Sequence, residues 1–110
     1  MEKRQIGDKM ASTKQFRDFI LEQLREIENI SCKPMMGEFL LYYNGILFGG
    51  IYDDRLLLKT TKTNEKYALQ KEIPYNGAKP MFMVENLDDV QYLKDIIETT
   101  YKGLKANKKA

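Results

Sequence analysis

The dipeptide Asn44-Gly45 constrains the fold of this chain most strongly, because it separates two runs of strand-forming residues. A two-residue type I′ turn requires positive φ at both central positions, and Asn followed by Gly tolerates that conformation well. Asp53-Asp54 is a second and weaker turn signal, since Asp accepts a left-handed conformation less readily than Gly. Together the two turns predict a three-stranded antiparallel meander between Met35 and Lys59.

Strict alternation of side chains along this meander predicts two faces, and both are apolar. An antiparallel sheet with one side in water alternates apolar with polar residues, and this one does not. Because each large apolar side chain contributes roughly 1.5–3 kcal/mol when buried, we expect both faces to be covered. The predicted faces consist of Leu40, Tyr42, Leu47, Gly49, Ile51, Leu56 and Leu58 on one side, and of Phe39, Leu41, Tyr43, Ile46, Phe48, Tyr52 and Leu57 on the other, with Arg55 and Lys59 at one end of the second face.

Two dipeptides within this stretch have more than one interpretation. Gly49-Gly50 lies inside the predicted middle strand and lacks the spacing of a phosphate-binding loop, so we expect close packing or a β-bulge there. Met35-Met36 is typical either of an adaptable binding surface or of core filling, since methionine is flexible and polarisable. We expect core filling.

Two amphipathic patterns flank the meander. The first predicts a helix over about residues 13–29, capped by Ser12 or Thr13. The second predicts a helix capped by Asn86 and ended by Gly103. Their apolar stripes consist of Phe16, Phe19, Ile20, Leu24 and Ile27 in the first pattern, and of Leu87, Val90, Leu93, Ile97, Tyr101 and Leu104 in the second.

Shorter patterns complete the predicted order. Residues 31–36 predict an edge strand, because Pro34 cannot donate to a central ladder, and residues 81–85 predict a fourth strand. Residues 64–70 predict a short helix capped by Thr63. We therefore expect one α+β domain with an N-terminal helix, an antiparallel β-meander of about four strands, and a C-terminal helix packed on the sheet. The predicted boundaries are a flexible leader at 1–11, the folded domain at 12–104 and a basic tail at 105–110.

Composition excludes several classes of function. The chain has 110 residues, enough for one core, and no histidine, which excludes His-based catalysis and the commonest metal sites. Cys32 is the only cysteine, so no intrachain disulfide is expected and a cytoplasmic location is the default. No apolar run is long enough to span a bilayer, so we expect no membrane association. The acidic residues form no catalytic pair, and we predict a protein that is not an enzyme and uses no cofactor or metal.

An ungapped set of residues across the meander matches a family signature: Lys33, Met35, Gly37, Tyr42, Asn44, Gly45, Leu47, Phe48, Asp53, Arg55, Leu56, Leu58 and Lys59. This set resembles the N-terminal domain of the TfoX (Sxy) competence regulators. That family's signature begins with a basic residue and M-F-G-G, continues to Y-x-D-G and M-F-A, and ends with D-G-R-L-Y-L-K. Met36, Glu38 and Asp54 depart from it, standing where the family has Phe, Gly and Gly.

The resemblance extends to the flanking helices and covers about residues 13–104. It implies a regulatory, non-enzymatic domain linked to transcription of DNA-uptake genes. Full-length members carry a second, C-terminal helical domain, so the resemblance here implies an N-terminal domain that stands alone.

Because both faces of the meander are apolar, we predict that one packs under the two helices and that the other binds a partner. The most economical partner is a second copy of the chain in a homodimer, and another regulatory protein is the alternative. A monomer with helices on both faces is also consistent with the pattern. The predicted partner face consists of Phe39, Leu41, Tyr43, Phe48, Tyr52 and Leu57.

Two other functions stay open from the sequence. Aromatic residues among basic ones are typical of platforms that stack nucleic-acid bases, but a net charge of +2 is too balanced to indicate DNA binding by itself. A small-molecule pocket between sheet and helix has no residue signature here. The predicted basic contacts are Lys33, Arg55 and Lys59.

Overall fold

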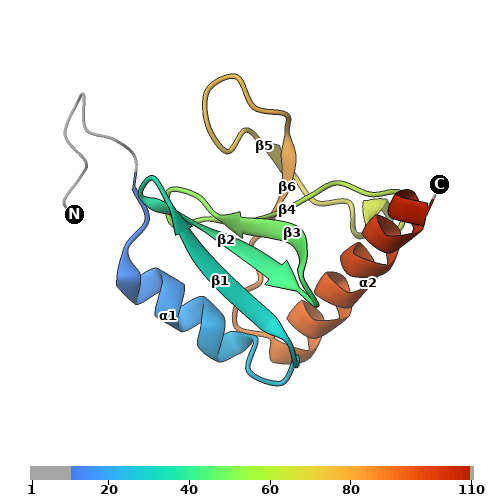
Figure 1. The fold of residues 1–110 in the computed structure, drawn as a ribbon, viewed down its shortest axis with the longest axis horizontal. Helices are drawn as coiled ribbons and strands as arrows, with labels where there is room; N and C mark the ends of the chain where they lie inside the picture. The colour runs from blue at the N-terminus through green and yellow to red at the C-terminus, as the bar shows by residue number, and fades with distance from the viewer. Residues whose placement is uncertain (1–10, 110) are drawn as a thin grey trace.

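The computed structural model describes residues 11–109, which form two α-helices and one antiparallel sheet (Figure 1). The strands are hydrogen-bonded in the order β1-β2-β3-β4-β6-β5, so the sheet has six strands rather than the predicted four. The α+β class is confirmed. The elements are α1 (Lys14–Gln23), β1 (Ile30–Met35), β2 (Glu38–Tyr43), β3 (Ile46–Ile51), β4 (Leu56–Leu58), the 3₁₀ helix η1 (Glu65–Tyr67), β5 (Lys71–Glu72), β6 (Met81–Val84) and α2 (Val90–Lys109).

Three consecutive two-residue turns connect β1 to β4. Both central residues of each turn have positive φ, as a type I′ turn requires, and this confirms the two turns predicted from the sequence. Across the last turn, Tyr52 and Arg55 exchange both backbone hydrogen bonds, at 2.9 and 3.0 Å. The central residues and their φ angles are Met36 at 51° and Gly37 at 88°, Asn44 at 51° and Gly45 at 81°, and Asp53 and Asp54 at 55° each.

A β-bulge in β3 changes the faces that strict alternation predicts. Tyr43 pairs with Ile46 as expected, but Leu41 pairs with Gly49 instead of Phe48. Phe48 is therefore the extra residue, and side-chain parity reverses beyond it. The bulge brings Ile51, Leu56 and Leu58 onto the face of Phe39 and Leu41, and it moves Tyr52 and Leu57 to the opposite face.

The six residues of the predicted partner face consequently do not form one surface, and that prediction is wrong. Tyr43 packs at the edge of the core, where its ring stacks on Tyr101 of α2 with centroids 4.4 Å apart. Tyr52 and Leu57 lie on the other side of the sheet and are buried there. The remaining three are at most 8% exposed and belong to the core: Phe39, Leu41 and Phe48.

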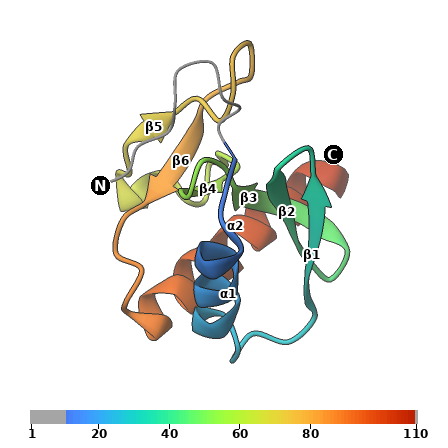
Figure 2. The same ribbon diagram turned by 90° about the vertical axis from the view of Figure 1, so that its left-hand side faces the viewer.

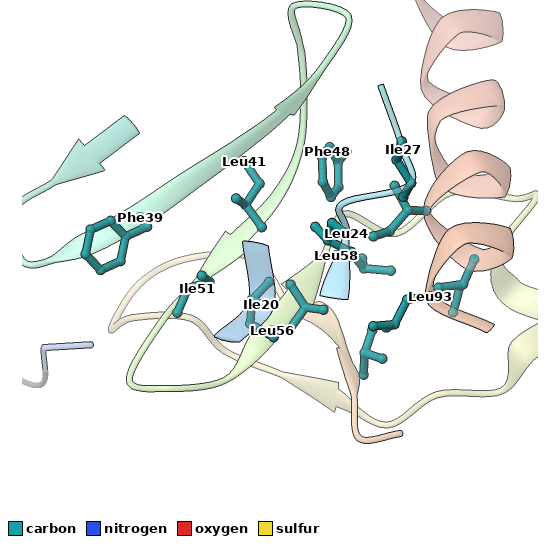
Figure 3. Packing of buried hydrophobic residues seen from close by; sticks show 13 residues of the cluster. Ile20, Leu24, Ile27, Phe39, Leu41, Phe48, Ile51, Leu56, Leu58 and Leu93 are labelled. Carbon is teal, nitrogen blue, oxygen red and sulfur yellow. The ribbon is translucent and has the colours of Figure 1, made fainter. Parts of the chain in front are cut away.

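Both helices cover the same face of the sheet, as Figures 1 and 2 show from two directions. The core therefore lies between this face and the helices (Figure 3). The N-terminal segment contributes Ile20, Leu24 and Ile27, and α2 contributes Leu93 and Ile97. This arrangement confirms that one sheet face packs under two amphipathic helices, although its residues differ from those predicted.

The helix boundaries also differ from the prediction. Helix α1 begins after Thr13, whose hydroxyl accepts a hydrogen bond from the Phe16 amide at 3.0 Å, but it ends at Gln23 rather than at residue 29. Helix α2 begins after Asp89, whose carboxylate accepts from the Tyr92 amide at 3.0 Å, so Asn86 is not the cap. It continues past Gly103 to Lys109 and includes most of the predicted tail. Residues 1–10 of the predicted leader lie outside the described residues.

Candidate functional site

Within residues 11–109, neither α-helix covers the other sheet face, which is named the open face here. It consists of side chains that the register places opposite the core: Leu40, Tyr42, Leu47, Tyr52, Leu57 and Met83. The loop of residues 73–80, between β5 and β6, lies over part of this face through a Tyr52–Tyr75 ring contact at 6.1 Å. On the open face, Leu57 is fully buried and Leu40, Tyr42 and Leu47 are half-buried. Two pockets lie beside the loop.

The first pocket, named the Met36 pocket, has a volume of about 580 Å³. The β1–β2 turn, the β3–β4 turn and the 73–80 loop contribute its lining. Met36 is 83% exposed, so its side chain is not the core filler that we expected. Tyr75 and Ile73 are 57% and 47% exposed, and they place further apolar surface on the adjoining loop. The lining residues are Met35, Met36, Glu38, Asp53, Arg55, Pro74, Tyr75 and Asn76.

The predicted basic contacts are separated on the structure. The Arg55 guanidinium donates to the Tyr52 carbonyl at 3.0 Å and to the Ile73 carbonyl at 3.3 Å, and it pairs with Glu72 at 3.5 Å. These bonds connect the 73–80 loop to the β3–β4 turn. Arg55 therefore has a structural role. The Lys33 ammonium lies 5.2 Å from the centre of the Tyr42 ring. The structure therefore does not bring Lys33, Arg55 and Lys59 together as one basic patch.

The second pocket, named the Lys59 pocket, lies on the other side of Pro74 and Tyr75 and has a volume of about 510 Å³. It extends from the open face to the C-terminal part of α2. Its lining includes both rings of the Tyr52–Tyr75 contact. The lining residues are Leu47, Gly49, Tyr52, Lys59, Thr60, Pro74, Tyr75, Ala78, Lys79, Pro80, Met81 and Leu104.

A buried hydrogen-bond network holds the segment that carries Lys59 against α2. Asn64, which is fully buried, donates from Nδ2 to the Lys59 carbonyl and to Thr100 Oγ1, both at 2.9 Å. Its Oδ1 accepts from the Thr61 amide at 2.9 Å. The prediction that Thr63 caps a helix is wrong, because its hydroxyl donates to the Thr99 carbonyl at 2.7 Å. This network fixes the backbone of the pocket wall.

Some residues central to these sites were missed by sequence reasoning. Tyr75 and Lys79 lie in a loop whose only sequence signals are proline and Asn-Gly punctuation, which predict turns but not contacts. The predicted helix over residues 64–70 includes Asn64, although its position in the run T-T-K-T-N is typical of side chains that bond to nearby backbone. The Met35-Met36 pair was a usable signal for a binding surface.

Other chemistry is sparse in the described part of the chain. Burial raises the pKa of the Cys32 thiol, while nearby Arg17 lowers it and nearby Asp18 raises it. The net effect is a raised pKa, which disfavours the reactive thiolate at neutral pH. Within residues 11–109, no group of three or more His, Cys, Asp or Glu side chains is placed to hold a metal ion. None of the helices described is both long and apolar enough to cross a membrane.

Comparison with known proteins identifies the family. The model of the TfoX N-terminal domain matches residues 22–102. The chain belongs to the TfoX N-terminal domain family. It is also similar to the "Uncharacterized 12.7 kDa protein in trpE 5'region" of Spirochaeta aurantia, with 28% identity over 102 residues that cover 90% of this chain and 89% of that protein.

Two of the three departures from the TfoX signature meet at one place in the structure. Glu38 accepts hydrogen bonds from the Ser12 hydroxyl at 2.6 Å and from the Asp53 amide at 3.1 Å. The Asp54 amide donates to Ser12 Oγ at 3.0 Å, and its carboxylate accepts from the Thr13 amide at 2.7 Å. In this TfoX domain the two substituted carboxylates therefore fasten the start of α1 to the β3–β4 turn, beside the Met36 pocket.

Proposed function

We propose that this TfoX N-terminal domain is a non-enzymatic regulatory module that acts through protein–protein contacts at the Met36 pocket. The observation that carries this proposal is the exposure of Met36 and Tyr75 in the lining of one pocket on the open face, with exposed Ile73 on the adjoining loop. Exposed apolar side chains that cluster in this way are typical of interaction sites. The family relationship supports a role in regulating transcription of DNA-uptake genes, and such a role fits the expected cytoplasmic location.

The partner that this surface fits best is a second copy of the chain. A two-fold interface requires one surface patch to supply both halves of the contact. Here a protruding side chain, Met36, lies at the rim of an apolar pocket of about 580 Å³. The lining also contains both signs of charge, from Glu38, Asp53 and Arg55. The patch thus offers both an exposed apolar side chain and an apolar pocket to a second copy, and another regulatory protein is the alternative partner.

Light scattering across a range of protein concentrations tests the proposal. The wild-type chain is expected to show the mass of a dimer, and Met36→Asp the mass of a folded monomer, because the substitution places a charge in the contact. Asp also tolerates the positive φ of residue 36, so the turn is retained. Phe19→Asp is the matched control, since Phe19 is 38% exposed but lies on α1. A wild-type monomer at every concentration contradicts the proposed homodimer.

A further inference from the structure

The lining of the Lys59 pocket carries a net positive charge. Its lining contains two lysines, Lys59 and Lys79, and no Asp or Glu. Among the residues that the structure describes, neither ammonium group takes part in an ion pair. The Met36 pocket differs in this respect, because Arg55 there pairs with Glu72 and two carboxylates share the lining. The charge of the Lys59 pocket thus favours an anionic ligand.

The uncharged walls of the Lys59 pocket favour a flat and apolar ligand body. Tyr52 and Tyr75 contribute aromatic rings, with their planes inclined by 52°. Leu47, Met81 and Leu104 contribute aliphatic surface from β3, β6 and α2. Small-molecule sites typically have volumes of roughly 300–1,000 Å³ and combine apolar and aromatic walls with a few polar groups. At about 510 Å³, this pocket falls within that range.

One wall of the pocket is also held in place before any ligand binds. The Asn64 side chain bonds to the Lys59 carbonyl, and the Lys59 amide donates to the Phe48 carbonyl at 2.9 Å. The backbone on both sides of the lysine is therefore fixed, while its side chain is half-buried at the pocket. A cation on a fixed backbone loses less conformational freedom on binding than one on a mobile loop.

We infer that the Lys59 pocket binds a small organic anion with a flat, apolar body, such as an aryl carboxylate or a nucleoside monophosphate. The ring lies against Tyr52 and Tyr75, and the anionic group accepts hydrogen bonds from Lys59 and Lys79. This site adjoins the proposed dimer contact, and Pro74 and Tyr75 line both pockets.

Isothermal titration calorimetry on the full chain tests this inference with two matched pairs of probes, indole-3-acetate against indole-3-acetamide and adenosine monophosphate against adenosine. Within each pair only the anionic group differs. We expect at least one anion to bind about tenfold more tightly than its neutral partner, because the latter has no negative charge to attract the ammonium groups. Amide chemical shifts recorded during the same titration are expected to change at residues 59–60 and 74–81.

Substitution of single lysines shows which side chains bind the anionic group of the ligand. Lys59→Met and Lys79→Met are each expected to weaken binding of the anion roughly tenfold while the melting temperature stays near that of wild type. Lys62→Met is the control, because Lys62 is exposed on the same segment and does not line the pocket. If Lys59→Met does not fold, the affinity of Lys79→Met, whose substitution lies in the exposed loop, tests the inference by itself. The inference is overturned if neither anion binds at millimolar concentration, if the neutral probes bind equally well, or if the lysine variants bind like wild type.

Discussion

Gly103 of α2 packs so closely against Thr63 that a β-carbon on the glycine would overlap the threonine hydroxyl oxygen. The same β-carbon would lie 2.8 Å from Cβ of Thr61. Glycine in a helix interior normally costs stability, but here it allows the helix to approach the segment that carries Lys59 and Asn64. Gly103 is therefore a packing residue within α2, and the prediction that it ends the helix is wrong.

Gly103→Ala is expected to destabilise the protein by about 1–3 kcal/mol, as overpacking of a close contact does. Helix propensity alone predicts the opposite sign, since Ala is favoured over Gly by about 1 kcal/mol. Urea denaturation followed by circular dichroism measures the difference. Lys102→Ala, at the exposed neighbouring position, is the control and should stay within about 0.5 kcal/mol of wild type. A Gly103→Ala protein as stable as wild type would show that the contact is loose.

Ionisation of Tyr52 is expected to lower the free energy of unfolding at alkaline pH. Burial raises the pKa of Tyr52 above its usual value of 10.0, and the nearby charges of Tyr75, Glu38 and Tyr42 raise it further. The folded state therefore keeps its proton at a pH where the unfolded state has lost it. The stability contributed by neutral Tyr52 is fully present below pH 10.0 and is lost as the pH rises through the folded pKa.

Comparison of wild type with Tyr52→Phe isolates this effect. The free energy of unfolding is measured by urea denaturation at neutral pH and at several values above pH 10.0. We expect wild type to lose more stability than Tyr52→Phe over the alkaline range, because the variant has no group to ionise at this position. Parallel losses in the two proteins would mean that the Tyr52 hydroxyl is as accessible in the folded state as in the unfolded state.

Asp54 combines an unfavourable backbone conformation with a favourable contact. Its φ is 55°, and its carboxylate accepts a hydrogen bond from the Thr13 amide at 2.7 Å. Asp54→Ala loses the contact and keeps the strain, so we expect a loss of roughly 1–2 kcal/mol. Asp54→Gly loses the contact but relieves the strain, and Asp54→Asn keeps an acceptor that tolerates positive φ. The expected order of stability in thermal denaturation is wild type close to Asn, then Gly, then Ala. Asp54→Gly above wild type would show that the strain exceeds the value of the contact.

Local sequence signals predicted the hairpins well. Asn44-Gly45 and Asp53-Asp54 form the expected two-residue turns, because type I′ geometry depends on the conformational freedom of the turn residues themselves. The amphipathic stripes likewise predicted that two helices cover one face. These features depend on neighbours in the sequence, so no knowledge of distant contacts was needed.

The faces and the sites could not be predicted in the same way. One extra residue at Phe48 reverses the parity of every strand position beyond it, and Gly49-Gly50 indicated a bulge without giving its position. The contact of Tyr75 with Tyr52 joins residues 23 apart through a loop, and that depends on the tertiary fold. The Met36 and Lys59 pockets exist only because that loop lies over the sheet.

The most direct test of the account is a dilution series that follows backbone amide chemical shifts by NMR. If the Met36 pocket is the contact between two copies, the amides that change with concentration are expected to lie near Met36, Asp53 and residues 73–76. Helix α1 around Phe19 is expected to stay unchanged, and Met36→Asp should remove the concentration dependence. Changes centred on α1, or spectra that are identical at every concentration, would contradict the central claim that the open face carries the interaction surface.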